Sequence, residues 1–388
     1  MNSGKNIRTI TFTYLFKLLS NEKGLIYITA GNLTSAILGA IFWLILAAIL
    51  KVADYGEVNY IIAIASILTS IALLGLNTTI TTYLAKGETE VTYEAHVILF
   101  ISTITIALIA FLHNWETSLL LISMAFYTAS IANILGGKRY TEYALTQVGQ
   151  RLLQILLSTL LYLNLGLTGI ILGYAFSFAT FSYRYIITLP NLSLKFTSLK
   201  GKTAFILHSY GLNLINSSSN FIDKIIIGST YDFYHLGLYQ LGFQFLMFLG
   251  IIPSSMYIYL LPEESSGESK KEVKIIGVIT SIVLALIMAI ISPIIVKTLF
   301  PKYVEAVQMI QVMSVAVIPL TLVNVSNATL LAKEKSKQVF IGGIIFLALQ
   351  IPLLILLGKA LGTIGLAIAL TLSRSTQTIY ALIETLHA

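Results

Sequence analysis

The chain has 388 residues, of which 56% are hydrophobic and only 11% are charged. Soluble domains carry roughly 25% charged residues, so this composition excludes a set of water-facing domains and indicates an all-α, polytopic membrane protein. Lys and Arg (24) outnumber Asp and Glu (17), but the basic residues are dispersed among apolar runs. That pattern favours basic cytoplasmic loops over a nucleic-acid partner. The absence of Cys excludes disulfides and thiolate chemistry.

Twelve apolar stretches follow one another along the chain, each near the length of about 20 residues that a membrane-crossing helix needs. The predicted spans are 24–50, 58–84, 92–112, 117–136, 143–163, 167–189, 204–228, 236–261, 273–299, 304–332, 338–358 and 361–386. The basic segment 1–23 precedes them and is predicted to be a cytoplasmic or interfacial N-terminus. Ile10, Tyr14 and Leu18 stand there at helical spacing, so a short interfacial helix and a frayed terminus are both open.

The distribution of Lys and Arg between the loops predicts the orientation. With the N-terminus in the cytoplasm, 17 basic residues fall in inside segments and only four, Lys51, Lys297, Lys302 and Lys359, fall in outside loops. Because basic residues gather on the cytoplasmic side, we expect a multi-pass protein of the plasma (inner) membrane with both termini in the cytoplasm.

The sequence also contains a weak internal repeat. A shift of 181 residues places Asn32 on Asn213 and Gly56 on Gly237. A shift of 196 residues places Leu135 on Leu331, Gly166 on Gly362, Gly169 on Gly365, and Ser177 on Ser373. These matches pair span one with seven and span six with twelve. They predict two parallel six-helix bundles, 24–190 and 204–388, joined by a cytoplasmic linker at 191–203, with a cavity between them. The alternative is an accidental twelve-helix bundle.

Polar residues recur at helical spacing inside three spans, where they are costly and tend to face a bundle interior or a wet cavity. The rows are Asn213, Asn216, Ser217, Asn220 and Lys224 in span seven, Gln147, Gln150, Arg151, Gln154 and Ser158 in span five, and Arg374, Gln377 and Thr378 in span twelve. Asn32 is a single amide in span one, and Asp223 lies at the edge of the row in span seven. We interpret the rows as cavity lining. Hydrogen bonding between helices that only holds the bundle together is the alternative.

The charges within the spans are mostly positive. Arg151, Lys224 and Arg374 outnumber Asp223, so the predicted cavity is cationic and suits an anionic cargo such as a diphosphate-linked or acidic saccharide. Asp223 and Lys224 are adjacent on a helix, point about 100° apart and need not pair. Lys224 also stands near the end of its span, where its ammonium group could reach the interface.

Catalytic and cofactor motifs are not found. The segment from Gly201 to Thr203 resembles the end of a phosphate-binding loop, but Phe196 stands where that motif needs Gly. Three Asp and five His are scattered without metal-ligand spacing, so we expect no metal, no cofactor and no enzymatic activity.

Several segments resemble the Wzx-type polysaccharide flippases of the multidrug/oligosaccharidyl-lipid/polysaccharide (MOP) superfamily. They are GN at 31–32 with ADYGE at 53–57, FIDKIIIG at 221–228 with LGLY at 236–239, and LFPKY at 299–303 with Ala306 and NATLLA at 327–332. The resemblance implies a MATE-like pair of six-helix bundles around a cationic lumen, often with ion coupling. It implies a cargo of lipid-linked oligosaccharide or polysaccharide repeat units, such as O-antigen units, and partners among membrane lipids, glycan polymerases and glycosyltransferases. Asp223 and Lys224 occupy the charged seventh-span position of that family.

Two features depart from branches of the superfamily. Span one has no acidic residue, although the drug antiporters commonly carry one there, and twelve spans are two fewer than the lipid II branch usually has. The leading hypothesis is a flippase that moves lipid-diphosphate-linked glycans by alternating access, without ATP. The runner-up is a cation-coupled multidrug or small-solute antiporter, for which Asp223 is the ion-coupling candidate. A membrane-embedded glycosyltransferase or polymerase and a scaffold without transport are the remaining alternatives.

Overall fold

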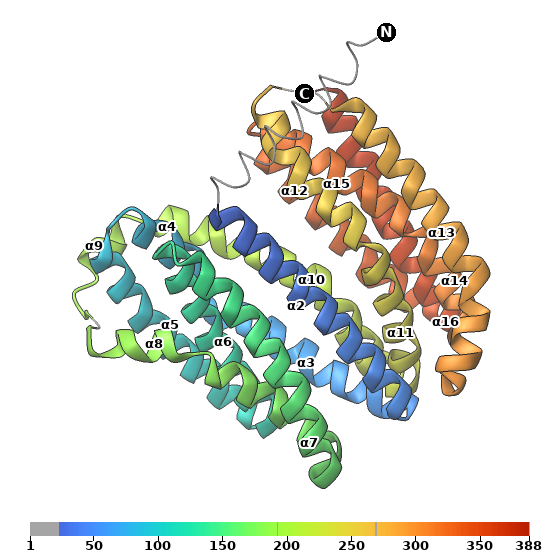
Figure 1. Ribbon diagram of the computed structural model, residues 1–388, viewed down its shortest axis with the longest axis horizontal. Coiled ribbons are helices and arrows are strands. Elements are labelled where there is room, and N and C mark those ends of the chain that lie inside the picture. Colours follow the sequence, from blue (N-terminus) through green and yellow to red (C-terminus); the bar gives the residue numbers. More distant parts are fainter. Residues whose placement is uncertain (1–22, 192, 268–269, 388) are drawn as a thin grey trace, which may run out of the picture. The chain divides into compact units, whose positions relative to one another are not determined.

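The computed structural model describes residues 23–191, 193–267 and 270–387, and every regular element in these ranges is helical. The predicted interfacial segment lies almost wholly outside them. The helices are α2 (Lys23–Ile49), α3 (Val52–Leu73), α4 (Leu76–Ala85), α5 (Thr89–Phe111), α6 (Trp115–Gly136), α7 (Tyr140–Thr180), α8 (Tyr183–Thr188), α9 (Thr197–Lys200), α10 (Thr203–Thr230), α11 (Phe233–Leu249), α12 (Ile251–Ser265), α13 (Lys271–Leu299), α14 (Val307–Val315), α15 (Val317–Ala332) and α16 (Ser336–Leu386), with 3-10 turns at Leu189–Asn191 and Pro301–Ala306 (Figure 1).

The long helices α7 and α16 each reverse direction at a glycine. A straight helix of 51 residues such as α16 would be about 77 Å long, far more than the roughly 30 Å of a bilayer core. Gly166 in α7 and Gly362 in α16 have φ values of 59° and 60° with non-helical ψ, a conformation that residues with a side chain avoid. The Ser158 hydroxyl donates to the carbonyl of Ile170 at 3.1 Å, although residues twelve apart in a continuous helix are about 18 Å apart. Each helix is therefore a hairpin of two spans.

The number of membrane-crossing segments is consistent with the predicted twelve. Among the described residues, eight helical stretches are long and apolar enough to cross a membrane, and the bent pair α11 and α12 makes a ninth. The reversals within α7 and α16 raise the number to eleven. The remaining long helix is α10, whose 28 residues would span a bilayer but include the polar row.

The chain divides into two compact units. The first contains the described residues up to Ile41 and Thr69–Tyr210, and the second contains Phe42–Leu68 and the described residues from Gly211 onward. The helices α2, α3 and α10 thus each contribute to both units. The division into bundles 24–190 and 204–388, which the repeat suggested, stays a prediction.

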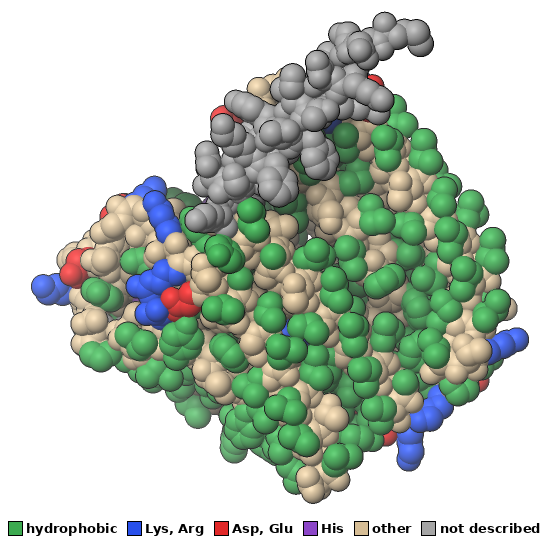
Figure 2. Space-filling view, viewed as in Figure 1, with side chains coloured by type: hydrophobic (Ala, Val, Ile, Leu, Met, Phe, Trp, Pro, Cys, Tyr) green, Lys and Arg blue, Asp and Glu red, His purple; other side chains and the backbone are tan. Residues whose placement is uncertain are grey.

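Large aliphatic side chains cover the outside of each unit. Ile290 on α13 is 73% exposed and Leu163 on α7 is 75% exposed. Figure 2 shows hydrophobic side chains over α7 in the first unit and over α13 in the second. The inside of the first unit instead contains small residues and buried aromatic rings, such as Ala95, Ala129 and Tyr185. Apolar surface of this extent needs a lipid environment, and the chain is a multi-pass membrane protein.

The described part of the linker is fixed to the first unit. The buried carboxylate of Glu94 on α5 accepts hydrogen bonds from the backbone N–H groups of Ser198 (3.3 Å) and Leu199 (2.7 Å) at the start of α9. Lys202 forms an ion pair with Glu88 at 3.0 Å. These contacts hold the first turns of α10 in place, because α10 begins directly after Lys202.

Candidate functional site

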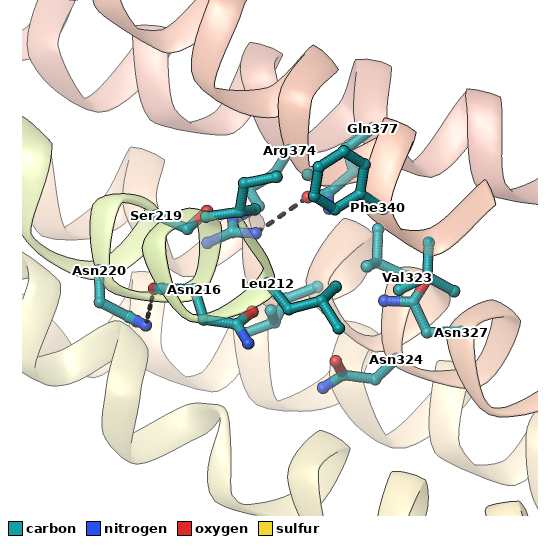
Figure 3. A pocket seen from close by; sticks show the side chains of 14 residues that line it. Leu212, Asn216, Ser219, Asn220, Val323, Asn324, Asn327, Phe340, Arg374 and Gln377 are labelled. Carbon is teal, nitrogen blue, oxygen red and sulfur yellow. Dashed lines mark hydrogen bonds between the residues drawn. The ribbon is translucent and has the colours of Figure 1, made fainter. Parts of the chain in front are cut away.

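A polar pocket lies within the second unit and has walls from α10, α15 and α16 (Figure 3). Its volume is about 190 Å³. The lining residues are Leu212, Ile215, Asn216, Ser219, Asn220, Leu320, Val323, Asn324, Asn327, Val339, Phe340, Gly343, Arg374 and Gln377. Figure 3 shows Asn216 and Asn220 on α10 across from Asn324 and Asn327 on α15. The amides thus face the pocket from two helices.

Arg374 is the charged residue of this pocket. Its guanidinium Nη1 donates to the Gln377 side-chain oxygen at 2.9 Å, and the group lies 3.7 Å from the ring centroid of Phe346. Arg374 stands near the middle of the span that follows Gly362, at the depth where transporters of repeated architecture bind their substrates. Phe346 and Gln377 hold the guanidinium without neutralising its charge, since neither side chain is acidic.

Asp223 and Lys224 form a buried ion pair next to this pocket. The Lys224 ammonium lies 3.1 Å from the Asp223 carboxylate, and their side chains are 4% and 1% exposed. Lys224 also donates to the carbonyl of Asn220 at 2.6 Å and lies 3.8 Å from the ring centroid of Phe243. The Tyr239 hydroxyl donates to the other Asp223 oxygen at 2.8 Å.

This pair corrects two expectations from the sequence. We expected that the adjacent side chains need not pair, but rotation about the flexible Lys224 side chain brings its ammonium group back to Asp223. The alternative that Lys224 reaches the interface is wrong, because the ammonium group is buried and has polar and aromatic partners. Lys224 and Asp223 are absent from the pocket lining, so their predicted roles in cargo binding and ion coupling stay predictions.

The charges of this region leave one cation unbalanced. Asp223 neutralises Lys224, and its carboxylate also interacts electrostatically with Arg374. One negative and two positive groups therefore share the interior of the second unit. A buried net charge is unfavourable without a counter-ion, so a bound anion at Arg374 would stabilise the site.

The polar row of α7 differs because hydrogen bonds within the first unit occupy most of it. The Gln147 side chain accepts from Tyr127 and donates to the Tyr143 hydroxyl at 3.1 Å. Tyr143 in turn donates to Asn32 at 2.7 Å. Asn32 and Gln147 thus take part in hydrogen bonds between helices, which is the alternative to cavity lining for these two residues.

Farther along α7, Gln150 and Gln154 are buried, and Gln150 donates to the Ser177 hydroxyl at 3.0 Å. Arg151 donates to the Gln154 side-chain oxygen at 2.7 Å. Arg151 and Arg374 are therefore held in the same way, by a glutamine three residues later. Among the ion pairs of the described residues, none involves Arg151.

The structure brings some predicted residues together and adds others. Asn216, Asn220 and Arg374 share the pocket, whereas Asn213 is not part of its lining. Asn324 and Asn327 were missed as site residues, although their three-residue spacing in a span already indicated a shared helix face. Their amides have no hydrogen-bond partner among the residues that the structure describes. His, Asp and Glu do not cluster in groups of three or more that could hold a metal, as far as the structure describes the chain.

Comparisons with known proteins agree with this architecture. A family model described as polysaccharide biosynthesis protein matches residues 22–262, and a model described as lipid II flippase MurJ matches residues 238–387. No curated protein matches the sequence.

Solved structures share the fold at low sequence identity. A lipid II flippase MurJ in an inward closed conformation aligns with a TM-score of 0.76 and 12% identity, over 92% of this chain and 87% of that one. An inward-facing multidrug resistance MATE transporter of the MOP superfamily aligns with a TM-score of 0.71 and 13% identity, over 94% and 97%. A MATE transporter variant from Vibrio cholerae aligns with a TM-score of 0.64 and 15% identity, over 94% and 96%. With a family model that covers well over half of its length, the chain belongs to the polysaccharide biosynthesis protein family.

Proposed function

We propose that this protein is a flippase that moves lipid-diphosphate-linked oligosaccharide or polysaccharide repeat units from the cytoplasmic to the outer leaflet of the plasma membrane. It acts by alternating access and without ATP. Family membership and a fold shared with a lipid II flippase support this function. The loop charges support an inner-membrane location with both termini in the cytoplasm, and the cargo makes glycosyltransferases and a glycan polymerase its functional partners.

The observation that carries the proposal is the unbalanced guanidinium of Arg374 in a pocket of amides. Arg presents a planar fork of donors that matches phosphate oxygens. Its direct partners among the described residues are an aromatic ring and an amide, and the nearby Asp223 carboxylate already pairs with Lys224, so the charge is available to an anion. Arg151 is held in the same way, by Gln154, and is a second candidate for binding phosphate. Lys224 does not contact the cargo in this proposal. It neutralises Asp223, and the positive charge of Arg374 therefore stays unbalanced.

The runner-up, a cation-coupled multidrug antiporter, draws support from the shared fold of the MATE transporters. Such a transporter needs a carboxylate that is released and rebound by its coupling ion. Asp223 is engaged by Lys224 and Tyr239, and a positive pocket repels organic cations. These contacts favour the flippase over the antiporter. Asp223 is the one carboxylate on α10, and it stays the candidate for ion coupling.

The test measures flipping in vesicles that contain the purified full chain and a fluorescent lipid-diphosphate-linked glycan. A membrane-impermeant quencher reports the amount that reaches the far leaflet. We expect Arg374→Ala to slow flipping roughly 10- to 100-fold, because a hydrogen bond to a charged group contributes about 1.5–3 kcal/mol. The flipping rate of Arg374→Lys should lie between those of wild type and Arg374→Ala, since the charge remains and the planar fork of donors is lost.

Lys359→Ala is the matched control, because it also removes a cation from α16 but at an exposed position outside the pocket. It should flip the glycan at the wild-type rate. If Arg374→Ala also kept the wild-type rate at equal protein density, the proposed cationic site would be wrong. Uptake of an organic cation in exchange for protons or sodium, with no flipping of the glycan, would support the antiporter instead.

A further inference from the structure

The pocket around Arg374 contains more polar groups than a phosphate alone requires. The side chains of Asn216, Ser219, Asn324 and Asn327 line it. None of them has a hydrogen-bond partner among the residues that the structure describes. Each carboxamide offers two donors and one acceptor, so the pocket presents unused donors and acceptors together.

The size of the pocket limits its occupant to a small group. A volume of about 190 Å³ is below the roughly 300–1,000 Å³ of pockets that hold drug-sized ligands. We infer that the enclosed part of the pocket has room for about one sugar ring. Asn216 and Asn220 are exposed, so the remainder of a longer glycan can continue out of the pocket past α10.

The charge of the pocket limits the occupant further. Arg374 is the one charged residue among the fourteen that line it, and no Lys or second Arg lies there. A sugar with its own carboxylate would bring a second negative charge without a cation to meet it, and an unpaired charge in a poorly hydrated site is strongly disfavoured. Hydroxyl and acetamido groups, in contrast, both donate and accept, as the four side chains do. The ring of Phe340 adds an apolar wall (Figure 3).

We propose that this pocket is a subsite for a single uncharged sugar ring of the cargo, with Asn324 and Asn327 on α15 as the residues that select it. The inference rests on the proposed flippase function, because Arg374 is taken to bind the phosphate that joins the sugar to its lipid. The sugar beside the diphosphate carries hydroxyl or acetamido groups and no acid. Asn216 and Ser219 on α10 complete the ring of hydrogen bonds from the opposite wall.

The experiment measures binding of three lipid probes to the full chain in lipid nanodiscs. The probes are a polyprenyl diphosphate without sugar, the same lipid with one N-acetylhexosamine, and the same lipid with one hexuronic acid. We expect wild-type protein to bind the N-acetylhexosamine probe at least about 10-fold more tightly than the other two, as two or three neutral hydrogen bonds provide.

Substitutions on α15 should remove this preference. Asn324→Leu and Asn327→Leu keep the side-chain size and lose the amide, and each should weaken binding of the N-acetylhexosamine probe roughly 3- to 10-fold while the sugar-free probe is unaffected. Asn164→Leu is the matched control, since this exposed amide on α7 has the carbonyl of Leu160 as its one hydrogen-bond partner among the described residues. Asn327→Lys adds a cation and should raise affinity for the hexuronic acid probe.

The outcomes separate the two proposals. If all diphosphate probes bind but the sugar and the α15 substitutions make no difference, the subsite is wrong and the flippase function stands. Tighter binding of the hexuronic acid probe by wild-type protein would also overturn the subsite. If no diphosphate probe binds while the protein is folded, the proposed function fails and the subsite with it.

Discussion

Two glycines related by the internal repeat allow α3 and α11 to meet backbone to backbone within the second unit. A Cβ atom added at Gly56 would lie 2.8 Å from the backbone nitrogen of Gly237 and closer still to the carbonyl of Phe233. One added at Gly237 would lie 2.8 Å from the carbonyl carbon of Val52 and closer to its oxygen. Because each glycine opposes the residue four positions before the other, the contact is two-fold symmetric, like the isologous interface of a dimer.

Gly56→Ala should therefore force the two helices apart. Ordinary contact of a Cβ atom begins at 3.4 Å, so the backbones must separate by more than about 0.6 Å, and no side chain can rotate away to relieve the clash. Overpacking costs typically 1–3 kcal/mol, and contact with rigid backbone places this case near about 3 kcal/mol. For a unit of this size the melting midpoint should fall by roughly 6–12 °C.

The assay is thermal unfolding of the purified protein, followed by fluorescence-detected size exclusion. Gly201→Ala is the control, because an added Cβ meets nothing within 4 Å and the φ of −73° is ordinary. The double variant Gly56→Ala with Gly237→Ala should lose about as much as the worse single variant, since one separation relieves both clashes. A midpoint within about 1 °C of wild type for Gly56→Ala, or strictly additive losses in the double variant, would refute the symmetric contact.

Three further predictions concern the hairpins, the linker and the topology. Gly362→Ala should destabilise the protein by about 1–3 kcal/mol in thermal unfolding, because φ is 60° although the space around Gly362 is open; an unchanged midpoint would contradict the reversal. Glu94→Gln should weaken the hydrogen bond from the Leu199 backbone N–H to this side chain. Tryptic cleavage at Lys200 and Lys202 should then be several-fold faster than in wild type. Equal cleavage rates would contradict the proposed role of Glu94 in fixing the linker. Because the chain has no Cys, single replacements Lys335→Cys and Lys51→Cys report topology cleanly. An impermeant thiol reagent added to intact cells should label only the second, and labelling of the first would reverse the orientation.

Much of the fold was predictable because long apolar stretches and their breaks are direct consequences of bilayer thickness. Gly166 and Gly362 were aligned by the repeat, and the structure gives both the same left-handed conformation and the same role of reversing a helix. The sequence did not reveal that residues 42–68 pack with the second unit. That assignment depends on close contacts, such as Lys302 donating to the carbonyls of Ile49 (3.0 Å) and Leu50 (3.3 Å), which no periodicity records.

The candidate site was predictable where polarity stands out against an apolar background. The polar row on α10 and Arg374 are of this kind, and the structure places Asn216 and Asn220 of that row at one pocket with Arg374. Asn324 and Asn327 were overlooked although they stand in the apolar helix α15, because they are only two amides and neither carries a charge. Charge alone also could not separate Lys224 from Arg374, since both are cations within predicted spans.

The difference between these two cations comes from their neighbours rather than from their own chemistry. Lys224 has a flexible side chain that folds back on Asp223, and Tyr239 fixes the carboxylate for it. Arg374 has a rigid fork that lies 3.7 Å from the ring centroid of Phe346 and donates a hydrogen bond to Gln377. An ion pair whose charges neutralise each other binds an anionic cargo weakly. A preorganised cation without a paired carboxylate of its own is stabilised when it binds an anion. The same reasoning applies to Arg151, whose partner Gln154 also leaves the charge uncompensated. The affinity of this protein for an anionic cargo should therefore follow its two glutamine-held arginines rather than its total positive charge.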